Sequence, residues 1–170
     1  MSPRVVLVGP MGAGKTTVGT LLAHAWGTTA RDTDHDVEAR AGKAISEIFV
    51  DDGEEAFRAL ERAAVAEALA GHDGVLALGG GAVLDPGTRE LLAGREVVFL
   101  RVGLSDAVKR VGLGVGRPLL LGNVRGRIKT LLDERTPVYE SVATLVVDTD
   151  GRSPEDVAGE IVAALGKESS

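Results

Sequence analysis

The segment 9–16 constrains the fold of this chain more than any other feature. It reads Gly9-Pro10-Met11-Gly12-Ala13-Gly14-Lys15-Thr16, which fits the phosphate-loop pattern G-x-x-x-x-G-K-[S/T]. The apolar run Val5–Val8 precedes it, and the helical sequence 17–25 follows it. A glycine-rich turn with an incidental lysine is the alternative, but strand, loop and helix all agree with nucleotide binding.

A phosphate loop wraps its backbone N–H groups around phosphate oxygens at the positive end of the helix that follows. The lysine reaches the β- and γ-phosphates, and the threonine hydroxyl can ligate Mg²⁺. The residues expected to bind ATP in this segment are therefore Gly12, Ala13, Gly14, Lys15, Thr16 and Thr17.

The rest of the chain alternates between apolar runs and helical patterns. The further apolar runs are 75–78, 97–100 and 144–147, with 28–32 as a weaker strand; the helical patterns are 15–26, 54–70, 86–93, 105–111, 124–142 and 154–165. Alternation of this kind predicts right-handed crossovers and an α/β fold with a parallel sheet covered on both faces. No stretch resembles a linker or a repeat, so we expect residues 1–170 to form a single domain with ligands at the carboxyl ends of the strands.

Composition excludes several classes of function. The chain has 170 residues, 44% of them hydrophobic and 26% charged, with no cysteine and a net charge of −6. Disulfides and cysteine-ligated zinc are ruled out, the three histidines have no metal spacing, and any metal must be held by oxygen. The negative net charge does not indicate the basic surface that nucleic-acid binding requires. The apolar runs are far shorter than the roughly 20 residues of a membrane span, and no leader precedes them, so we expect a cytoplasmic protein without membrane contact.

Two carboxylates, Asp32 and Asp34, end the weak strand. The run 75–78 ends in Gly79-Gly80-Gly81 rather than in the carboxylate that often completes a magnesium shell. Alternate strand positions would point Asp32 toward the metal and Asp34 toward a second substrate. The alternative makes Asp32, Asp34 and Asp36 a solvated turn that caps a helix.

Beyond the phosphate loop, an ordered set of motifs covers nearly the whole chain, and with it the sequence resembles the shikimate kinase family. The motifs are GPMGAGKTTVG at 9–19, D-T-D at 32–34, ISEIF at 45–49, DGEEAFRALE at 52–61, LGGGAV at 78–83, RPLL at 117–120, ERTPVY at 134–139 and VDT at 147–149 with Pro154. The resemblance implies a three-layer α/β sandwich of the P-loop kinase type, whose five-stranded parallel sheet is like that of nucleoside monophosphate kinases, with a small mobile lid. It implies transfer of a phosphoryl group from ATP, with one Mg²⁺ ion, to the 3-hydroxyl of shikimate, on the pathway to chorismate and the aromatic amino acids. We expect a monomer whose only partners are ATP and shikimate.

The resemblance also implies roles for individual residues. Positions matching the shikimate-binding motifs are Asp34, Arg58, Gly80 and Arg135, and those matching the magnesium positions are Thr16 and Asp32. Arg117 matches a lid arginine that approaches the transferring phosphate, while Arg110 and Arg152 match positions that flank adenine. Lys15, Asp34 and Arg117 are the expected catalytic residues. Thr20 departs from the family pattern, because a basic residue is expected there.

The residues near these motifs suggest an acceptor pocket in a helical, substrate-binding region at about 33–61. The spacing of Arg58 and Glu61 puts both on one helix face, and a weak surface ion pair is the alternative. Three glycines, Gly79, Gly80 and Gly81, leave room for a substrate, although a structural turn is the ordinary interpretation. Phe49 and Phe57 are more often core residues, but with the resemblance we place them at the edge of the pocket.

The segment 112–122 reads GLGVGRPLLLG, with glycine at both ends and one arginine before a proline. We interpret it as a lid that excludes water and carries Arg117 inward; a flexible loop without function is the alternative. The basic residues Arg125, Arg127 and Lys129 are interpreted as a solvated helix face without a chemical role.

Two other functions stay open on sequence grounds. A different small-molecule kinase, such as a gluconate or nucleoside monophosphate kinase, shares the loop and the size. A nucleotide-dependent switch would bind ATP without turning over an acceptor, but Asp34 and the arginine-bearing lid favour an enzyme.

Overall fold

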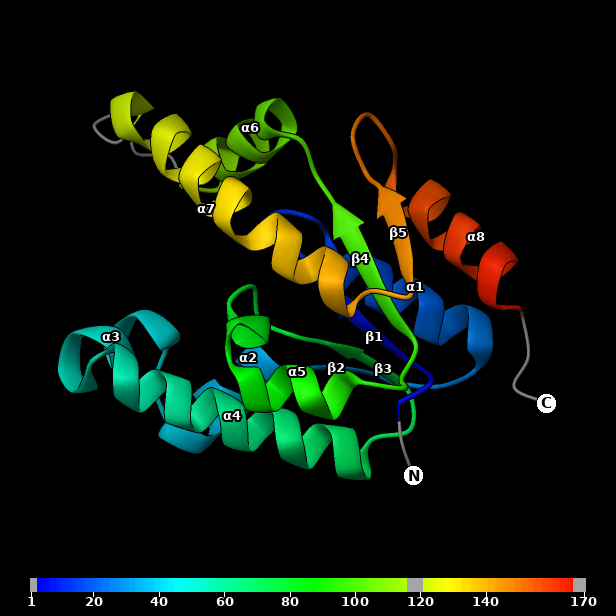
Figure 1. The fold of residues 1–170 in the computed structure, drawn as a ribbon, viewed down its shortest axis with the longest axis horizontal. Coiled ribbons are helices and arrows are strands. Elements are labelled where there is room, and N and C mark those ends of the chain that lie inside the picture. The colour runs from blue at the N-terminus through cyan, green and yellow to red at the C-terminus, as the bar shows by residue number, and fades with distance from the viewer. Residues whose placement is uncertain (1–2, 116–120, 167–170) are drawn as a thin grey trace.

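The fold is built on one parallel sheet (Figure 1). The structure, a computed structural model, describes residues 3–115 and 121–166. The sheet has five strands in the order β2-β3-β1-β4-β5. Their bounds are β1 Val5–Val8, β2 Ala30–Asp32, β3 Val75–Ala77, β4 Val97–Arg101 and β5 Leu145–Asp148. Every pairing is parallel, so all carboxyl ends lie on one edge.

Helices connect the strands and cover both faces of the sheet (Figure 1). Their bounds are α1 Lys15–Trp26, α2 Thr33–Ala41, α3 Ile45–Asp52, α4 Glu54–Gly71, α5 Pro86–Leu92, α6 Leu104–Val115, α7 Leu121–Val142 and α8 Pro154–Leu165, with a short 3-10 helix at Ala82–Leu84. Within the described residues, none of these helices is long and apolar enough to cross a bilayer.

The central strand β1 explains the three layers. All four of its side chains are buried, and successive side chains of a strand point to opposite faces. Val5 and Leu7 enter a core with side chains of α1 and α8. Val6 and Val8 enter a second core with side chains of α4, α5 and α7. A run of four apolar residues without alternation therefore indicates burial on both faces.

The sequence predicted the fold class correctly: a three-layer α/β sandwich on a five-stranded parallel sheet. Helices α1 and α8 have the predicted bounds, whereas the expected helical region 33–61 is divided into α2, α3 and the start of α4, a division that the sequence did not predict. Each of these two short helices buries few side chains, which join Phe57 and Ala64 of α4 in a small separate cluster. That cluster attaches the region 33–61 to the rest of the molecule.

The ends of the expected lid are helical rather than loop. Residues 112–115 complete α6 and residues 121–122 begin α7. Residues 116–120, including Arg117, lie outside the described part of the chain.

Gly74, at the entry to β3, leaves no room for a side chain. A Cβ atom there would lie 2.0 Å from the carbonyl oxygen of Thr29. We expect Gly74→Ala to lower the free energy of unfolding by about 1–3 kcal/mol, because the backbone must shift. Gly159→Ala in α8 is the matched control: its Cβ would meet nothing within 4 Å, so it should raise stability by about 0.5–1 kcal/mol. Urea unfolding of the wild type and both variants measures these changes. Equal urea midpoints for Gly74→Ala and the wild type would contradict the close packing at Gly74.

Candidate active site

The phosphate loop joins β1 to α1 at the carboxyl edge of the sheet. Gly9, Gly12 and Gly14 have positive φ angles, which residues with a side chain rarely adopt. Gly14 is the N-cap of α1, so the first N–H groups of that helix open toward the loop. This backbone provides the anion-binding geometry that the sequence predicts for an ATP phosphate site.

Lys15 spans the loop. Its Nζ donates hydrogen bonds to the carbonyl oxygens of Gly9 at 2.6 Å and Pro10 at 3.0 Å. Burial of the ammonium group lowers its pKa from 10.5 to about 8, although the nearby carboxylates of Asp34 and Asp32 oppose this shift. The lysine is thus held inside the site by backbone oxygens and balanced by two carboxylates.

Thr16 and Asp32 meet at the mouth of the loop. The Thr16 hydroxyl donates to Oδ2 of Asp32 at 2.9 Å, while Oδ1 of Asp32 accepts the Asp34 N–H at 2.8 Å. Asp32 therefore caps α2, as the alternative interpretation expected, and it also faces Thr16, while its role at a metal stays a prediction. Two converging oxygen donors fit Mg²⁺, which favours oxygen ligands completed by phosphate and water.

The predicted placement of Asp34 on a strand is wrong. Asp34 lies in the first turn of α2, because the Asp32 side chain ends the strand and starts the helix. Its carboxylate packs against Gly79, where a Cβ atom would lie 2.4 Å from Oδ1. Burial and the neighbouring Asp32 raise the pKa of Asp34, and Lys15 lowers it. A carboxylate with a raised pKa accepts a proton more readily.

Arg58 and Glu61 form the predicted pair on α4. The Nη1 of Arg58 donates to Oε1 of Glu61 at 2.7 Å. Glu61 is 3% exposed, so the alternative of a surface ion pair is wrong. Burial raises the pKa of Glu61, and the bond to Arg58 opposes that rise. Glu61 therefore orients the Arg58 guanidinium, whose Nη2 also lies 3.6 Å from a carboxylate oxygen of Glu54.

The two phenylalanines lie beside this pair. The rings of Phe49 and Phe57 have centroids 4.8 Å apart, and the Arg58 guanidinium lies 5.2 Å from the Phe57 ring centre. Phe57 is buried, whereas Phe49 is 39% exposed. Phe57 belongs to the small hydrophobic core of α2, α3 and α4, and the exposed ring of Phe49 packs against Phe57 outside that core.

Each of the three glycines after β3 lies near a charged group of the site, and Gly79 lies near both Asp34 and Glu61. A Cβ on Gly81 would lie 2.7 Å from both terminal nitrogens of Arg58, and one on Gly80 would lie 3.7 Å from Nη1 of Arg135. Gly79 faces Asp34 in the same way. Gly80 and Gly81 form a turn, as the ordinary interpretation of these glycines expects, and at Gly79 and Gly81 the absent side chain also lets charged groups approach the backbone.

A single cavity of about 690 Å³ joins the phosphate loop to these groups. Its lining includes the predicted residues Gly12, Gly14, Lys15, Thr16, Thr17, Asp32, Asp34, Phe49, Phe57, Arg58, Glu61, Gly80, Gly81 and Arg135. Ala13 and Gly79 are buried beside it and are not part of this lining.

Sequence reasoning missed one basic residue of this cavity. Arg127, interpreted as part of a solvated face, lines the cavity with Leu131 and Arg135 of the same helix. The three residues are spaced at i, i+4 and i+8, which places them on one stripe of α7. That periodicity was the available signal.

A smaller cavity of about 200 Å³ adjoins the other side of the loop and is lined by Arg110 and Arg152. Arg110 donates to the carbonyl oxygen of Gly12 at 2.9 Å and that of Thr149 at 3.0 Å. Arg152 is bonded to Glu160 at 2.6 Å. The structure thus brings both expected adenine-flanking arginines to the loop.

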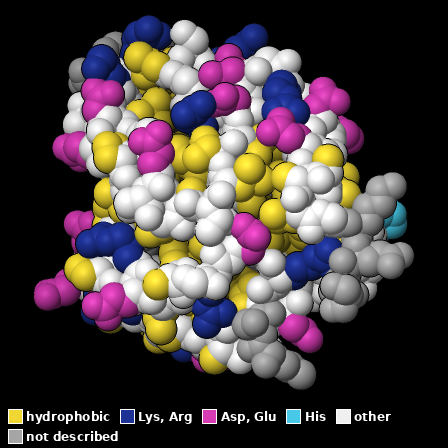
Figure 2. All heavy atoms as spheres, turned by 45° about the vertical axis from the view of Figure 1, so that its right-hand side comes forward, with side chains coloured by type: hydrophobic (Ala, Val, Ile, Leu, Met, Phe, Trp, Pro, Cys, Tyr) yellow, Lys and Arg dark blue, Asp and Glu magenta, His cyan; other side chains and the backbone are white. Residues whose placement is uncertain are grey.

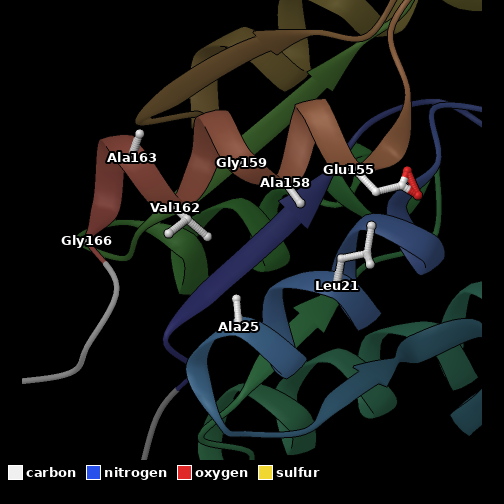
Figure 3. Close-up of a pocket in the computed structure, with 8 residues that line it drawn as sticks. All are labelled: Leu21, Ala25, Glu155, Ala158, Gly159, Val162, Ala163 and Gly166. Carbon is white, nitrogen blue, oxygen red and sulfur yellow. The ribbon is translucent and has the colours of Figure 1, made fainter.

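An open apolar groove of about 570 Å³ lies between α1 and α8, the two helices that pack on the same face of the sheet. Hydrophobic side chains gather at the centre of that face (Figure 2). Leu21 and Ala25 of α1 project toward Ala158 and Val162 of α8 across the groove (Figure 3). Among the residues that the structure describes, Glu155 is the one ionisable residue that lines the groove, and the groove shares no lining residue with the phosphate-loop cavity.

A phosphate loop that opens into a pocket of buried acidic and basic side chains, on a parallel sheet, defines a P-loop kinase of small molecules. Comparison with known proteins agrees. A sequence model of the shikimate kinase family matches residues 11–166. The chain belongs to the shikimate kinase family.

Individual relatives match along nearly the full chain. A shikimate kinase of Salinispora arenicola is 62% identical and covers 97% of this chain and 99% of its own length. A shikimate kinase of Thermobifida fusca is 61% identical and covers 92% of this chain and 91% of its own length. The solved structure of a shikimate kinase from Acinetobacter baumannii in complex with shikimate is 36% identical, with a TM-score of 0.89, covering 97% of this chain and 93% of that one. These comparisons confirm the family that the motifs predicted.

The lowered pKa of Lys15 makes stability depend on pH in a defined direction. Between its folded pKa of about 8 and the ordinary value of 10.5, the unfolded chain binds more protons than the folded chain. The free energy of unfolding of the ligand-free protein should therefore rise with pH in this window, by up to about 1.4 kcal/mol per pH unit, relative to Lys15→Met. Parallel denaturation curves for the two proteins from pH 8 to 10 would contradict this.

Proposed function

We propose that this chain transfers the γ-phosphoryl group of ATP to the 3-hydroxyl of shikimate, using the groups gathered in the phosphate-loop cavity. The observation that carries the proposal is that one cavity contains both the phosphate loop and the pocket of Asp34, Arg58, Glu61 and Arg135. An acceptor bound there lies next to the end of the phosphate chain, as direct transfer requires. The family membership confirms the activity predicted from the sequence, and it sets aside a gluconate or nucleoside monophosphate kinase and a non-catalytic switch.

Shikimate offers one carboxylate and three hydroxyl groups for recognition. In this proposal Arg58 and Arg135 bind the carboxylate, because planar guanidinium groups donate two parallel hydrogen bonds to it. Glu61 holds Arg58 in position through its 2.7 Å bond. Phe49 and Phe57 border the carbon ring, and the glycines allow it to approach the backbone.

Asp34 is the proposed partner of the reacting hydroxyl. It accepts the hydroxyl hydrogen and aims the oxygen at the γ-phosphorus. In a loose transition state the proton leaves late, so positioning matters at least as much as basicity. The pKa of Asp34, raised by burial and by Asp32, favours proton acceptance once the bond to phosphorus forms.

Lys15 and Arg117 are the proposed electrostatic partners of the transferring group. Lys15 already lies in the loop and compensates charge on the phosphate oxygens. Arg117 belongs to the proposed lid 112–122, whose central residues lie outside the described part of the chain. Arg110 and Arg152 border the adenine site in this proposal, and activity as a cytoplasmic monomer stays a prediction.

Thr16 and Asp32 are the proposed holders of one Mg²⁺ ion, which would neutralise phosphate charge when bound with ATP. Their oxygens already lie 2.9 Å apart, which supports a shared ligand. Among the described residues, no three histidine or acidic side chains converge into a metal cluster.

Release of ADP in a coupled assay tests the proposed activity. With Mg²⁺ and ATP present, shikimate should raise the rate by at least about a hundredfold over ATP hydrolysis alone, because the pocket positions the hydroxyl and excludes water. Gluconate and a nucleoside monophosphate are the matched controls and should leave the rate at its basal value. Equal rates with all three acceptors would overturn the proposal.

Asparagine variants separate the two carboxylates of the D-T-D motif. Asp34→Asn should lower kcat by about a hundredfold or more at saturating Mg²⁺, because general-base and positioning contributions are lost. Asp32→Asn should instead raise the Mg²⁺ concentration needed for half-maximal rate. Asp36→Asn is the matched control, since Asp36 bonds Arg31 and does not line the cavity. If excess Mg²⁺ restores Asp34→Asn but not Asp32→Asn, the two roles are reversed.

A further inference from the structure

The backbone of Gly79, Gly80 and Gly81, here called the glycine triplet, sets the spacing of the acceptor pocket. Gly79 and Gly81 face Asp34 and Arg58 at distances that leave no room for a Cβ atom, and a Cβ atom on Gly80 would be in van der Waals contact with Arg135. Gly80 also approaches the phosphate loop, because its Cβ would lie 3.6 Å from the Met11 nitrogen. A displacement of the triplet would therefore move the surface on which all three charged groups pack.

The sheet does not hold the triplet in place. Strand β3 ends at Ala77, two residues before Gly79. The ladder ends at Leu78, whose N–H donates to the Leu7 carbonyl at 3.0 Å. Glycine has the greatest backbone freedom of all residues, so three in a row need other partners to keep one conformation.

The Ala82 N–H donates to the Gly79 carbonyl and the Leu84 N–H to the Gly81 carbonyl, each at 3.1 Å. Two side-chain hydroxyl groups supply the other partners. The Gly79 N–H donates to Oγ1 of Thr33 at 3.1 Å, and the Tyr139 hydroxyl donates to the Gly80 carbonyl at 2.5 Å. Both side chains are fully buried. The hydroxyls thus bind the backbone of two adjacent residues, Gly79 and Gly80, from two different helices, α2 and α7.

Each hydroxyl lies close in its helix to a charged residue of the pocket, so its bond also fixes the position of that residue. Thr33 stands between Asp32 and Asp34, so its bond fixes the start of α2 against the triplet. Tyr139 follows Arg135 by one helical turn, so its bond fixes that part of α7. The Tyr139 ring also packs on Phe99 of β4, with centroids 5.0 Å apart, which orients the hydroxyl.

We propose that Thr33 and Tyr139 are positioning residues for the phosphoryl acceptor: their hydroxyls clamp the glycine triplet and thereby hold Asp34 and Arg135 at the separation that shikimate requires. Neither residue lines the cavity, and neither touches substrate in this proposal. The inference rests on the proposed function, which it deepens by adding two groups that act through others.

Variants that remove only the hydroxyls test the clamp. Thr33→Val keeps the shape of the side chain and leaves the Gly79 N–H without its partner, and Tyr139→Phe keeps the ring on Phe99. Each should raise both the KM and the calorimetric Kd for shikimate about tenfold, because a buried hydrogen bond is lost, while the KM for Mg-ATP changes less than about twofold. Thr33→Ser retains the hydroxyl and should restore shikimate binding.

A matched control shows whether loss of any buried threonine hydroxyl has this effect. Thr88 in α5 is also buried, and its hydroxyl contacts Asp85 rather than the triplet. Thr88→Val should leave the KM for shikimate unchanged even if it lowers the melting temperature. If Thr33→Val fails to fold, Tyr139→Phe carries the test alone.

A double variant tests whether the two hydroxyls act on one element. Because both bonds hold the same short segment, Thr33→Val with Tyr139→Phe should raise the KM for shikimate by less than the product of the single effects. A KM of the double variant that equals the full product of the two single effects would overturn the shared clamp.

Unchanged KM and Kd for shikimate in folded single variants, with an active wild type, would overturn the positioning role alone. A wild-type chain without shikimate-dependent ADP release would overturn the proposed function, and this role with it.

Discussion

Close approach of backbone to backbone at the carboxyl edge of the central strands is the constraint on which the rest of the structure depends. A Cβ on Gly9 would lie 2.7 Å from the Leu100 carbonyl, and Gly80 packs near the Met11 nitrogen. Strands β3 and β4 both pair with β1, so the segments that follow them lie directly beside the phosphate loop. The nucleotide site and the acceptor pocket become one cavity for this geometric reason.

Pairing of cations with carboxylates stabilises the buried charges of this cavity in the folded protein. Lys15 is opposed by Asp32 and Asp34, and Arg58 is bonded to the buried Glu61. Burial raises the pKa values of Asp34 and Glu61 and lowers that of Lys15, so each charge is costly alone and is stabilised by a neighbour. A local group of cations can therefore attract an anionic ligand, which is compatible with a net charge of −6.

The sequence predicted strongly periodic elements well and short ones poorly. The phosphate loop, the sheet and helices such as α1 carry dense apolar patterns, whereas α2 buries only Thr33 and Val37. With so little periodicity, Asp34 was placed on a strand, although the Asp32 cap puts it on a helix. The contact of Tyr139 with Gly80 joins residues 59 positions apart, and no local pattern indicates which backbone group a distant hydroxyl reaches.

The start of α2 shows why this helix matters beyond its size. Asp32 is the extended N-cap of α2, and Thr33 and Asp34 begin the helix, whose successive residues are rotated by about 100°. The three side chains can therefore address three different targets, where a strand would offer only two faces. These targets are the Thr16 hydroxyl, the Gly79 N–H and the acceptor side of the cavity. Because the three residues are consecutive, they move as one body. The proposed metal ligand, the backbone clamp and the proposed acceptor partner are thus mechanically coupled, and a shift of α2 that suits one of them displaces the other two.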